Sequence, residues 1–152
     1  MMKNQIIYVD MDDVLCDFTG AYDDALKVNA DMPYPQSQID FFRNLKPIEG
    51  AIEAYYLLSD LPNTDVYILS APLEYNPLSY TEKRIWVEEY LGFETVGKLI
   101  LSSDKSLLKG DYLIDDYAKG KGQENFEGRL IQFGSKEYPD WNSVLEFFSF
   151  ER

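Results

Sequence analysis

The most informative segment of the sequence is Ile6-Ile7-Tyr8-Val9-Asp10-Met11-Asp12-Asp13-Val14, in which an apolar run ends abruptly in carboxylates. The run is short and rich in β-branched and aromatic residues, which predicts a buried strand over 5–9. Side chains two apart on a strand point to the same side, so Asp10 and Asp12 face one spot if extended geometry persists through Met11. Ligands of open α/β sheets bind at the carboxyl ends of strands. The pair therefore predicts a metal, a phosphate held through a metal, or acid–base chemistry.

Strand and helix signals alternate along the rest of the chain. Apolar residues at helical spacing predict helices within 15–26, 52–59, 83–90 and 141–148, and short apolar runs predict strands at 66–69, 99–101, 112–114 and 130–133. This order predicts an α/β fold with a mostly parallel, Rossmann-like sheet flanked by helices. The proline-containing segment 29–47 does not fit a simple crossover and is interpreted as a small insertion. The glycine-rich, charged segment 117–128 is expected to be a surface loop.

Composition narrows the class of protein. The 152 residues suffice for one domain with a real core, and a net charge of -13 argues against a nucleic-acid surface. The absence of histidine excludes histidine triads and most zinc sites, and a single cysteine excludes an internal disulfide. With neither a long apolar segment nor a basic-then-apolar amino terminus, we expect no membrane span or signal peptide, and a cytoplasmic location. Nothing in the sequence favours one oligomeric state.

Four features lie at the ends of predicted strands, and parallel strands open on the same edge of a sheet. They are the acids Asp10 and Asp12, then Ser70, then Lys105, then the pair Asp115-Asp116. Carboxylates from the first and last features suit a hard cation such as Mg²⁺. A hydroxyl and a lysine suit phosphate oxygens, and an aspartate can attack phosphorus while a second one transfers protons.

Each feature also has a purely structural interpretation. Asp12, Asp13 and Asp17 suit the start of a helix beginning near Val14, through capping and the helix dipole. Asp115-Asp116 are also common turn residues. Ser70 is a common residue at a strand exit, and a lone Lys105 is most simply a solvated surface residue. The joint order of the four features, each at a strand end, favours a functional site.

The four features resemble the motifs of haloacid-dehalogenase-like phosphohydrolases. A closer resemblance is to the 5′(3′)-deoxyribonucleotidases, and it runs in order from about Ile6 to Asp116 with a weaker echo at Trp141. The stretches that carry it are Val9-Asp10-Met11-Asp12-Asp13-Val14-Leu15-Cys16-Asp17-Phe18, Pro47-Ile48-Glu49-Gly50-Ala51, Asn63-Thr64-Asp65-Val66, Tyr80-Thr81-Glu82-Lys83-Arg84-Ile85-Trp86-Val87-Glu88, Asp104-Lys105-Ser106 and Leu113-Ile114-Asp115-Asp116. The Glu82-Lys83 stretch points to the nucleotidase branch.

The resemblance implies a Mg²⁺-dependent phosphatase of nucleoside monophosphates that works through an aspartyl-phosphate. Asp10 is then the nucleophile and a metal ligand, and Asp12 is the acid–base group with its backbone carbonyl on the metal. Asp116 is the third protein ligand, with Asp115 supporting or sharing that task.

The same resemblance implies residues that hold the substrate, a small-molecule nucleotide or another phosphomonoester. Ser70 and Lys105 hold the phosphoryl group, and Lys83 is a further phosphate contact. Phe18 lines a base pocket, to which Phe41 or Phe42 contributes from a small helical cap at about 19–46. The cap interrupts a single domain, 1–152, after the first strand. Simple core packing explains Phe41 and Phe42 equally well.

The sequence departs from the family pattern in three places. Asp13 stands where a glycine is common, and aspartate tolerates left-handed backbone better than most residues. Its added charge either raises a neighbour's pKa or points into the helix start. Ala71 replaces a frequent second hydroxyl, and the cap is short. Alternatives are a phosphatase for another small phosphomonoester or a nucleic-acid 3′-phosphate, and a non-catalytic module that binds Mg²⁺ or nucleotide.

Overall fold

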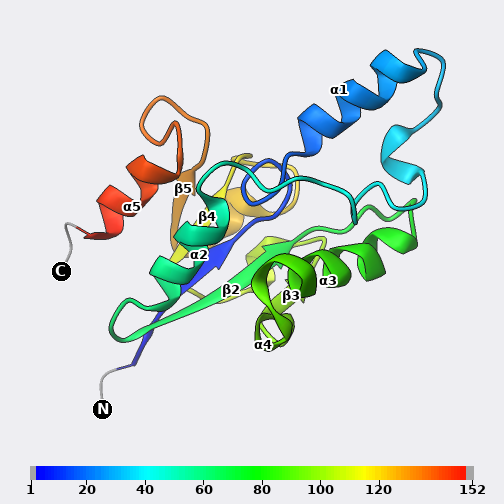
Figure 1. The fold of residues 1–152 in the computed structure, drawn as a ribbon. Helices are drawn as coiled ribbons and strands as arrows, with labels where there is room; N and C mark the ends of the chain where they lie inside the picture. Colours follow the sequence, from blue (N-terminus) through cyan, green and yellow to red (C-terminus); the bar gives the residue numbers. More distant parts are fainter. Residues whose placement is uncertain (1–2, 150–152) are drawn as a thin grey trace.

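Five parallel strands form one sheet in the order β3-β2-β1-β4-β5, so the strand that carries the first acids is central. The computed structural model describes residues 3–149. The strands are β1 (Gln5–Val9), β2 (Thr64–Ser70), β3 (Leu99–Leu101), β4 (Tyr112–Asp115) and β5 (Arg129–Gln132). The expected strands are present, and the sheet is parallel throughout, as Figure 1 shows.

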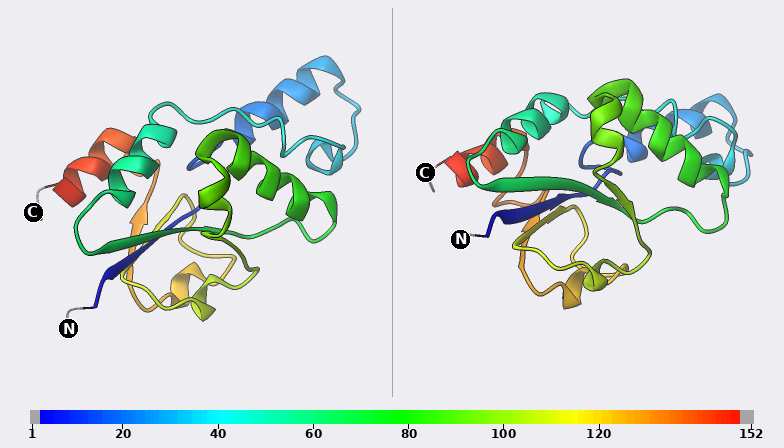
Figure 2. Two further views of the ribbon diagram at one scale, coloured as in Figure 1. Left: turned by 60° about the horizontal axis from the view of Figure 1, so that its bottom comes forward. Right: turned by 90° about the horizontal axis from the view of Figure 1, so that it is seen from below.

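The helices cover the sheet unequally. They are α1 (Phe18–Val28), α2 (Ala51–Ser59), α3 (Leu78–Leu91), α4 (Phe93–Val96) and α5 (Trp141–Ser149), with the short 3-10 turns η1 (Pro35–Ser37), η2 (Lys105–Leu107) and η3 (Gln123–Asn125). Figure 2 shows the longer helices on one side of the sheet and the loops that carry η2 and η3 on the other. Among residues 3–149, no helix combines the length and apolar character that crossing a bilayer requires.

The alternation of side chains along the strands produces two apolar cores. Ile7 and Val9 on β1 belong to the large core beneath the helices, whereas Tyr8 between them belongs to a small core with Leu69, Leu113 and Phe126. Both faces of β1 are therefore buried, which explains why its sequence is continuously apolar. The ends of β1 and β4 are fixed beside each other by the pairing of Val9 with Ile114.

A tight turn, rather than a helix, follows β1. The carbonyl of Met11 accepts hydrogen bonds from the N–H groups of Val14, Leu15 and Cys16 at 3.1, 2.8 and 3.0 Å. The expectation of a helix beginning near Val14 is wrong, because α1 begins only at Phe18. The side chains of Val14 and Leu15 are fully buried in the large core, so burial outweighs their helical spacing. The inserted segment, residues 18–46, comprises α1, η1 and irregular chain and projects beyond the carboxyl ends of the strands (Figure 1).

The carboxyl-terminal helix is tied to this turn. The buried indole of Trp141 in α5 donates from Nε1 to the carbonyl oxygen of Val14 at 2.8 Å. If a buried carbonyl loses its hydrogen-bond donor, nothing compensates for the water that it gave up on burial, and the folded state is destabilised. The contact therefore stabilises both the packing of α5 and the turn that carries the acids.

Replacing Trp141 with phenylalanine is expected to lower the free energy of unfolding by about 2 kcal/mol, because the variant leaves the Val14 carbonyl unpaired and underfills the core. Urea unfolding measures the change. The control is Tyr75→Phe, at a side chain that is 90% exposed, where a change below about 0.5 kcal/mol is expected. Equal unfolding midpoints for Trp141→Phe and the unmodified protein would contradict this reading of α5.

Candidate active site

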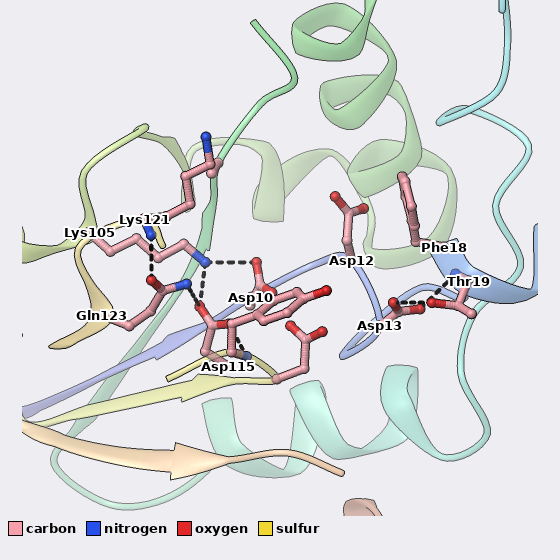
Figure 3. A pocket seen from close by; sticks show the side chains of 12 residues that line it. Asp10, Asp12, Asp13, Phe18, Thr19, Lys105, Asp115, Lys121 and Gln123 are labelled. Atoms are coloured by element: carbon pink, nitrogen blue, oxygen red, sulfur yellow. Dashed lines mark hydrogen bonds and ion pairs between the residues drawn. The ribbon is translucent and has the colours of Figure 1, made fainter. Parts of the chain in front are cut away.

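A pocket of about 240 Å³ opens at the carboxyl ends of β1 and β4. Five of the twelve side chains in its wall are acidic, two are lysines, two are aromatic, and three are small or neutral polar residues (Figure 3). The lining residues are Asp10, Asp12, Asp13, Phe18, Thr19, Ala71, Lys105, Asp115, Asp116, Tyr117, Lys121 and Gln123. The expected convergence of the β1 acids, Lys105 and the Asp115-Asp116 pair is therefore observed.

A buried lysine joins the two strand ends. The ammonium of Lys105 donates to Asp10 Oδ1 at 2.9 Å and to Asp115 Oδ2 at 2.5 Å, and all three side chains are nearly inaccessible. Burial by itself lowers the pKa of Lys105, but the attraction of both carboxylates outweighs burial and raises it. Lys105 is therefore charged at neutral pH, and it is not the solvated surface residue that the simplest interpretation of the sequence suggests.

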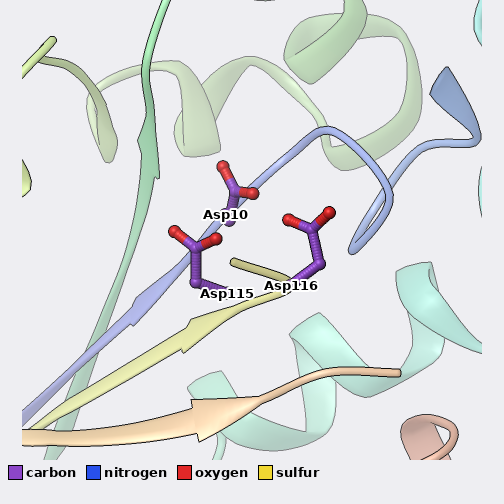
Figure 4. A group of neighbouring side chains, drawn as sticks. All are labelled: Asp10, Asp115 and Asp116. Carbon is purple, nitrogen blue, oxygen red and sulfur yellow. The ribbon is translucent and has the colours of Figure 1, made fainter. Parts of the chain in front are cut away.

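The carboxylates of Asp10, Asp115 and Asp116 each place an oxygen within 4.8 Å of the others (Figure 4). Burial raises the pKa of Asp10, and Asp115 adds to this effect while Lys105 opposes it. Burial also raises the pKa of Asp116 to about 9, with further contributions from Asp10 and Asp115. Oδ1 of Asp116 is buried and has no hydrogen-bond partner in residues 3–149. The cluster thus combines three carboxyl groups with the single ammonium of Lys105, and one buried oxygen of Asp116 lacks a partner in residues 3–149.

Asp115, the last residue of β4, and Asp116, which follows it, have different environments. Asp115 Oδ1 accepts the N–H of Tyr117 at 3.0 Å, and Oδ2 accepts from Lys105 and from Gln123 Nε2, the latter at 3.3 Å. Both oxygens of Asp115 are therefore occupied within the protein, whereas Asp116 keeps its unpaired Oδ1. This asymmetry makes Asp116 the more available of the two for a cation.

The sequence does not predict that Gln123 belongs to the site, because its pattern predicts a surface loop over residues 117–128. The side chain of Gln123 is only 5% exposed, and its Oε1 accepts the N–H of Lys121 at 2.7 Å. Gly122 permits this close packing, since it has φ +85° and an added Cβ would lie 2.1 Å from Asp104 Oδ1. A glycine before a polar residue is the only signal for this contact in the sequence, and it is a weak one.

A second buried lysine contacts Asp12. The ammonium of Lys83 donates to Asp12 Oδ2 at 2.9 Å and to Ser70 Oγ at 2.8 Å. Cys16 adds a weak contact from Sγ to Asp12 Oδ1 at 3.7 Å. Ser70 and Lys83 are buried, and neither is among the described residues that line the pocket. The structure therefore places both behind the wall, where Lys83 contacts the predicted acid–base group and Ser70 contacts Lys83.

The aromatic residues of the inserted segment divide between the pocket and the core. Phe18 lines the pocket, whereas Phe42 is 2% exposed and packs at a ring-centroid distance of 5.9 Å from Phe18. Phe41 contacts both rings, at 5.4 Å from Phe18 and 5.3 Å from Phe42. Phe42 therefore packs in the core, which is the alternative that the sequence allowed for it. Of these three rings, Phe18 is the one that lines the pocket.

The carboxylate of Asp13 binds the start of the inserted segment. Asp13 has φ 59°, which is the left-handed conformation that the sequence suggested aspartate would tolerate here. Its carboxylate accepts the N–H of Thr19 at 2.9 Å and the hydroxyl of Thr19 at 2.6 Å, as Figure 3 shows. Asp17 caps α1 by accepting the N–H of Gly20 at 2.9 Å. The structural interpretation therefore holds for Asp13 and Asp17, whose carboxylates are used at the helix start.

Comparison with known proteins agrees with this geometry. The model of the family described as 5′ nucleotidase, deoxy (pyrimidine), cytosolic type C protein matches residues 32–144. A protein of Vibrio phage KVP40, provisionally assigned as a 5′(3′)-deoxyribonucleotidase, is 42% identical over 150 residues, which are 96% of this chain and 85% of that protein. The human cytosolic 5′(3′)-deoxyribonucleotidase is 39% identical over 105 residues, 69% of this chain and 46% of its own length.

Solved structures share the fold at low sequence identity. The class C acid phosphatase of Bacillus anthracis has a TM-score of 0.60 at 16% identity, with 99% of this chain and 75% of that chain covered. YfnB of Bacillus subtilis, provisionally assigned as a HAD-hydrolase and solved with magnesium bound, has a TM-score of 0.56 at 12% identity, with 91% and 90% covered. The chain therefore has a haloacid-dehalogenase-like fold, and it belongs to the cytosolic type C family of 5′ deoxyribonucleotidases.

Proposed function

We propose that this chain is a divalent-metal-dependent phosphatase of deoxyribonucleoside monophosphates, with Asp10 as its nucleophile. The observation that carries the proposal is the convergence of three carboxylates, two buried and one partly buried, within 4.8 Å beside a charged lysine. The names of the relatives supply the substrate class, since the human relative is a 5′(3′)-deoxyribonucleotidase. A small-molecule substrate also agrees with the net charge of -13, which disfavours nucleic acid.

Mg²⁺ is the cation that we propose for the cluster. Carboxylate oxygens are the ligands that Mg²⁺ prefers, and the unpaired buried Oδ1 of Asp116 is the kind of atom that a cation would satisfy. Asp10 and Asp116 would hold the ion through their carboxylates, and Asp12 through its backbone carbonyl as the family resemblance implies. Asp115 would remain engaged with Lys105 and Gln123. The ion would supply positive charge against the phosphoryl oxygens.

The proposed reaction has two steps at Asp10. In the first, the Asp10 carboxylate attacks phosphorus, the bond from phosphorus to the sugar oxygen breaks, and Asp12 gives a proton to the departing alkoxide. In the second, Asp12 takes a proton from water, the water attacks phosphorus, and the acyl-phosphate bond breaks to release phosphate and restore Asp10. Lys105, 2.9 Å from Asp10 Oδ1, orients the nucleophile and offsets the negative charge of the phosphoryl group.

Phe18 is the residue that we propose for stacking against the nucleobase. Its ring belongs to the pocket wall and is held by Phe41 and Phe42 behind it. The inserted segment, 18–46, would then act as a small cap whose aromatic face covers the nucleoside. We propose a cytoplasmic location, in keeping with a free and buried Cys16.

The metal-free protein is expected to lose stability as pH rises from about 4 to about 9. Asp116 has a pKa of about 9 in the folded protein against an ordinary value of 3.8, so the folded state keeps a proton that the unfolded chain has released. The stability that this proton provides is complete below the unfolded value and is lost as pH approaches the folded one. Urea unfolding in chelator at several pH values measures it, and Asp116→Asn should flatten the dependence.

Mg²⁺ is expected to reverse the loss at pH 8 in the unmodified protein, by about 2.7 kcal/mol at a hundred times its Kd, because it binds the folded state only. Asp116→Asn should show little of this gain. Equal stabilisation of the two proteins by Mg²⁺ would remove Asp116 from the proposed ligands.

Asp10→Asn is expected to lower kcat toward dUMP in Mg²⁺ by at least about 10³, because an amide cannot attack phosphorus. Asp24→Asn, at a solvent-exposed acid of α1, is the control and should retain activity. Steady-state phosphate release measures both. Normal turnover by Asp10→Asn would reject the assigned nucleophile.

Phe18→Leu is expected to raise KM for dUMP about tenfold, because one base–aromatic stack is lost, while KM for a sugar phosphate stays the same. Phe93→Leu, at a ring that is 69% exposed on α4, is the matched control. A panel of dUMP, dTMP, AMP and a sugar phosphate gives the comparison. Equal losses on nucleotides and sugar phosphate would contradict the stacking role.

A further inference from the structure

Two consecutive charged residues of α3 are buried where the helix passes beneath the inserted segment (Figure 1). Glu82 is 3% exposed and Lys83 is 1% exposed. The reaction proposed above uses neither side chain directly. Charged residues are rarely buried unless their partners are well placed, so the partners indicate what each of the two does.

The carboxylate of Glu82 holds the inserted segment through its backbone. Oε2 accepts the N–H of Asp40 at 3.0 Å, and Oε1 accepts the N–H groups of Phe42 at 3.0 Å and Arg43 at 3.4 Å. Hydrogen bonds to an ionised acceptor are roughly twice as strong as neutral ones. Residues 40–43 are therefore anchored to α3 by one buried anion.

Phe42, one of the anchored residues, covers Lys83. The ammonium of Lys83 lies 4.8 Å from the centroid of the Phe42 ring, while it donates to Asp12 Oδ2 at 2.9 Å and to Ser70 Oγ at 2.8 Å. The ring closes one side of the ammonium, and the two oxygen atoms occupy others. Phe42, Asp12 and Ser70 therefore all contact the same ammonium.

We propose that Glu82 is a positioning residue for the acid–base group Asp12, acting through Phe42 and Lys83. The inference rests on the proposed function, in which Asp12 protonates the leaving group. If residues 40–43 detach from Glu82, the Phe42 ring moves off Lys83, water reaches the ammonium, and Asp12 loses its fixed partner. Proton donation requires a carboxyl held close to productive geometry, so it is the step that suffers.

The test compares two substrates of similar shape that differ in leaving group. Phenyl phosphate expels a basic phenolate that needs a proton, whereas 4-nitrophenyl phosphate expels a stable anion that does not. Glu82→Gln is expected to lower kcat/KM about tenfold for phenyl phosphate and by less than about twofold for the nitro compound. Lys83→Met, which removes the contact to Asp12 outright, should show the same selectivity with a larger loss, about a hundredfold.

Glu89→Gln is the matched control, because Glu89 is an exposed glutamate of the same helix whose ion pair at 3.2 Å joins the side chain of the anchored Arg43. It should leave both substrates unaffected, since exposed ion pairs contribute little. Equal losses on both substrates in Glu82→Gln, or no loss, would overturn the positioning role. If Glu82→Gln does not fold, Glu82→Asp keeps the charge on a shorter side chain and should give a smaller loss with the same selectivity.

Two measurements that do not require catalysis test this inference independently of the proposed function. In Glu82→Gln, amide hydrogen exchange at Asp40, Phe42 and Arg43 should quicken and the ¹⁵N resonance of the Lys83 ammonium should shift, and neither should change in Glu89→Gln. An unshifted Lys83 resonance would overturn the coupling even if exchange quickens. Absence of turnover of dUMP and of both aryl phosphates by the unmodified protein would contradict the proposed function, whereas the exchange and resonance measurements would still decide whether Glu82 positions Lys83.

Discussion

Burial of several carboxylates at one edge of a sheet is the constraint on which the rest of this structure depends. Asp10 follows the central strand and Asp115 ends its neighbour, and Lys105 holds the two together from within the protein. An unpaired buried charge is costly, and removing one partner of a buried pair destabilises strongly. The ammonium therefore joins two strand ends that the pairing of Val9 with Ile114 sets side by side, and Asp116, whose pKa burial raises to about 9, adds a further carboxyl beside them.

The segments around the site are arranged so that the Lys105 ammonium is held in place. The backbone N–H of Lys105 donates to the carbonyl of Lys121 at 2.7 Å, which draws the loop after β4 over it. Gln123 then enters the site and binds Asp115, and Gly122 permits the close approach. On the other side, Lys83 and Glu82 connect Asp12 to the inserted segment. Each catalytic acid of the proposed mechanism is thus held by a buried lysine from a different part of the chain.

The sequence predicted the strands and the meeting of their acidic ends, because both follow from local patterns and from the geometry of parallel sheets. It predicted the start of α1 too early, since core burial of Val14 and Leu15 outweighs their spacing. Gln123 and Glu82 bind partners that lie 8 and 40 residues away in the sequence, and neither contact follows from the period of a helix or a strand. Ser70, Lys83 and Phe42 lie near the site but behind the wall of the pocket. The spacing of residues along the sequence does not predict whether a side chain lines the pocket or lies behind its wall.

In the proposed site, Asp10 and Asp116 share one divalent cation while Asp115 is reserved for Lys105. Anomalous diffraction from crystals soaked in Mn²⁺, which takes the same oxygen ligands as Mg²⁺, tests it most directly. One strong peak is expected in contact with the carboxylates of Asp10 and Asp116, with Asp115 still bonded to Lys105. A peak bound by Asp115 in place of Asp116, or no peak at this edge of the sheet, would contradict it.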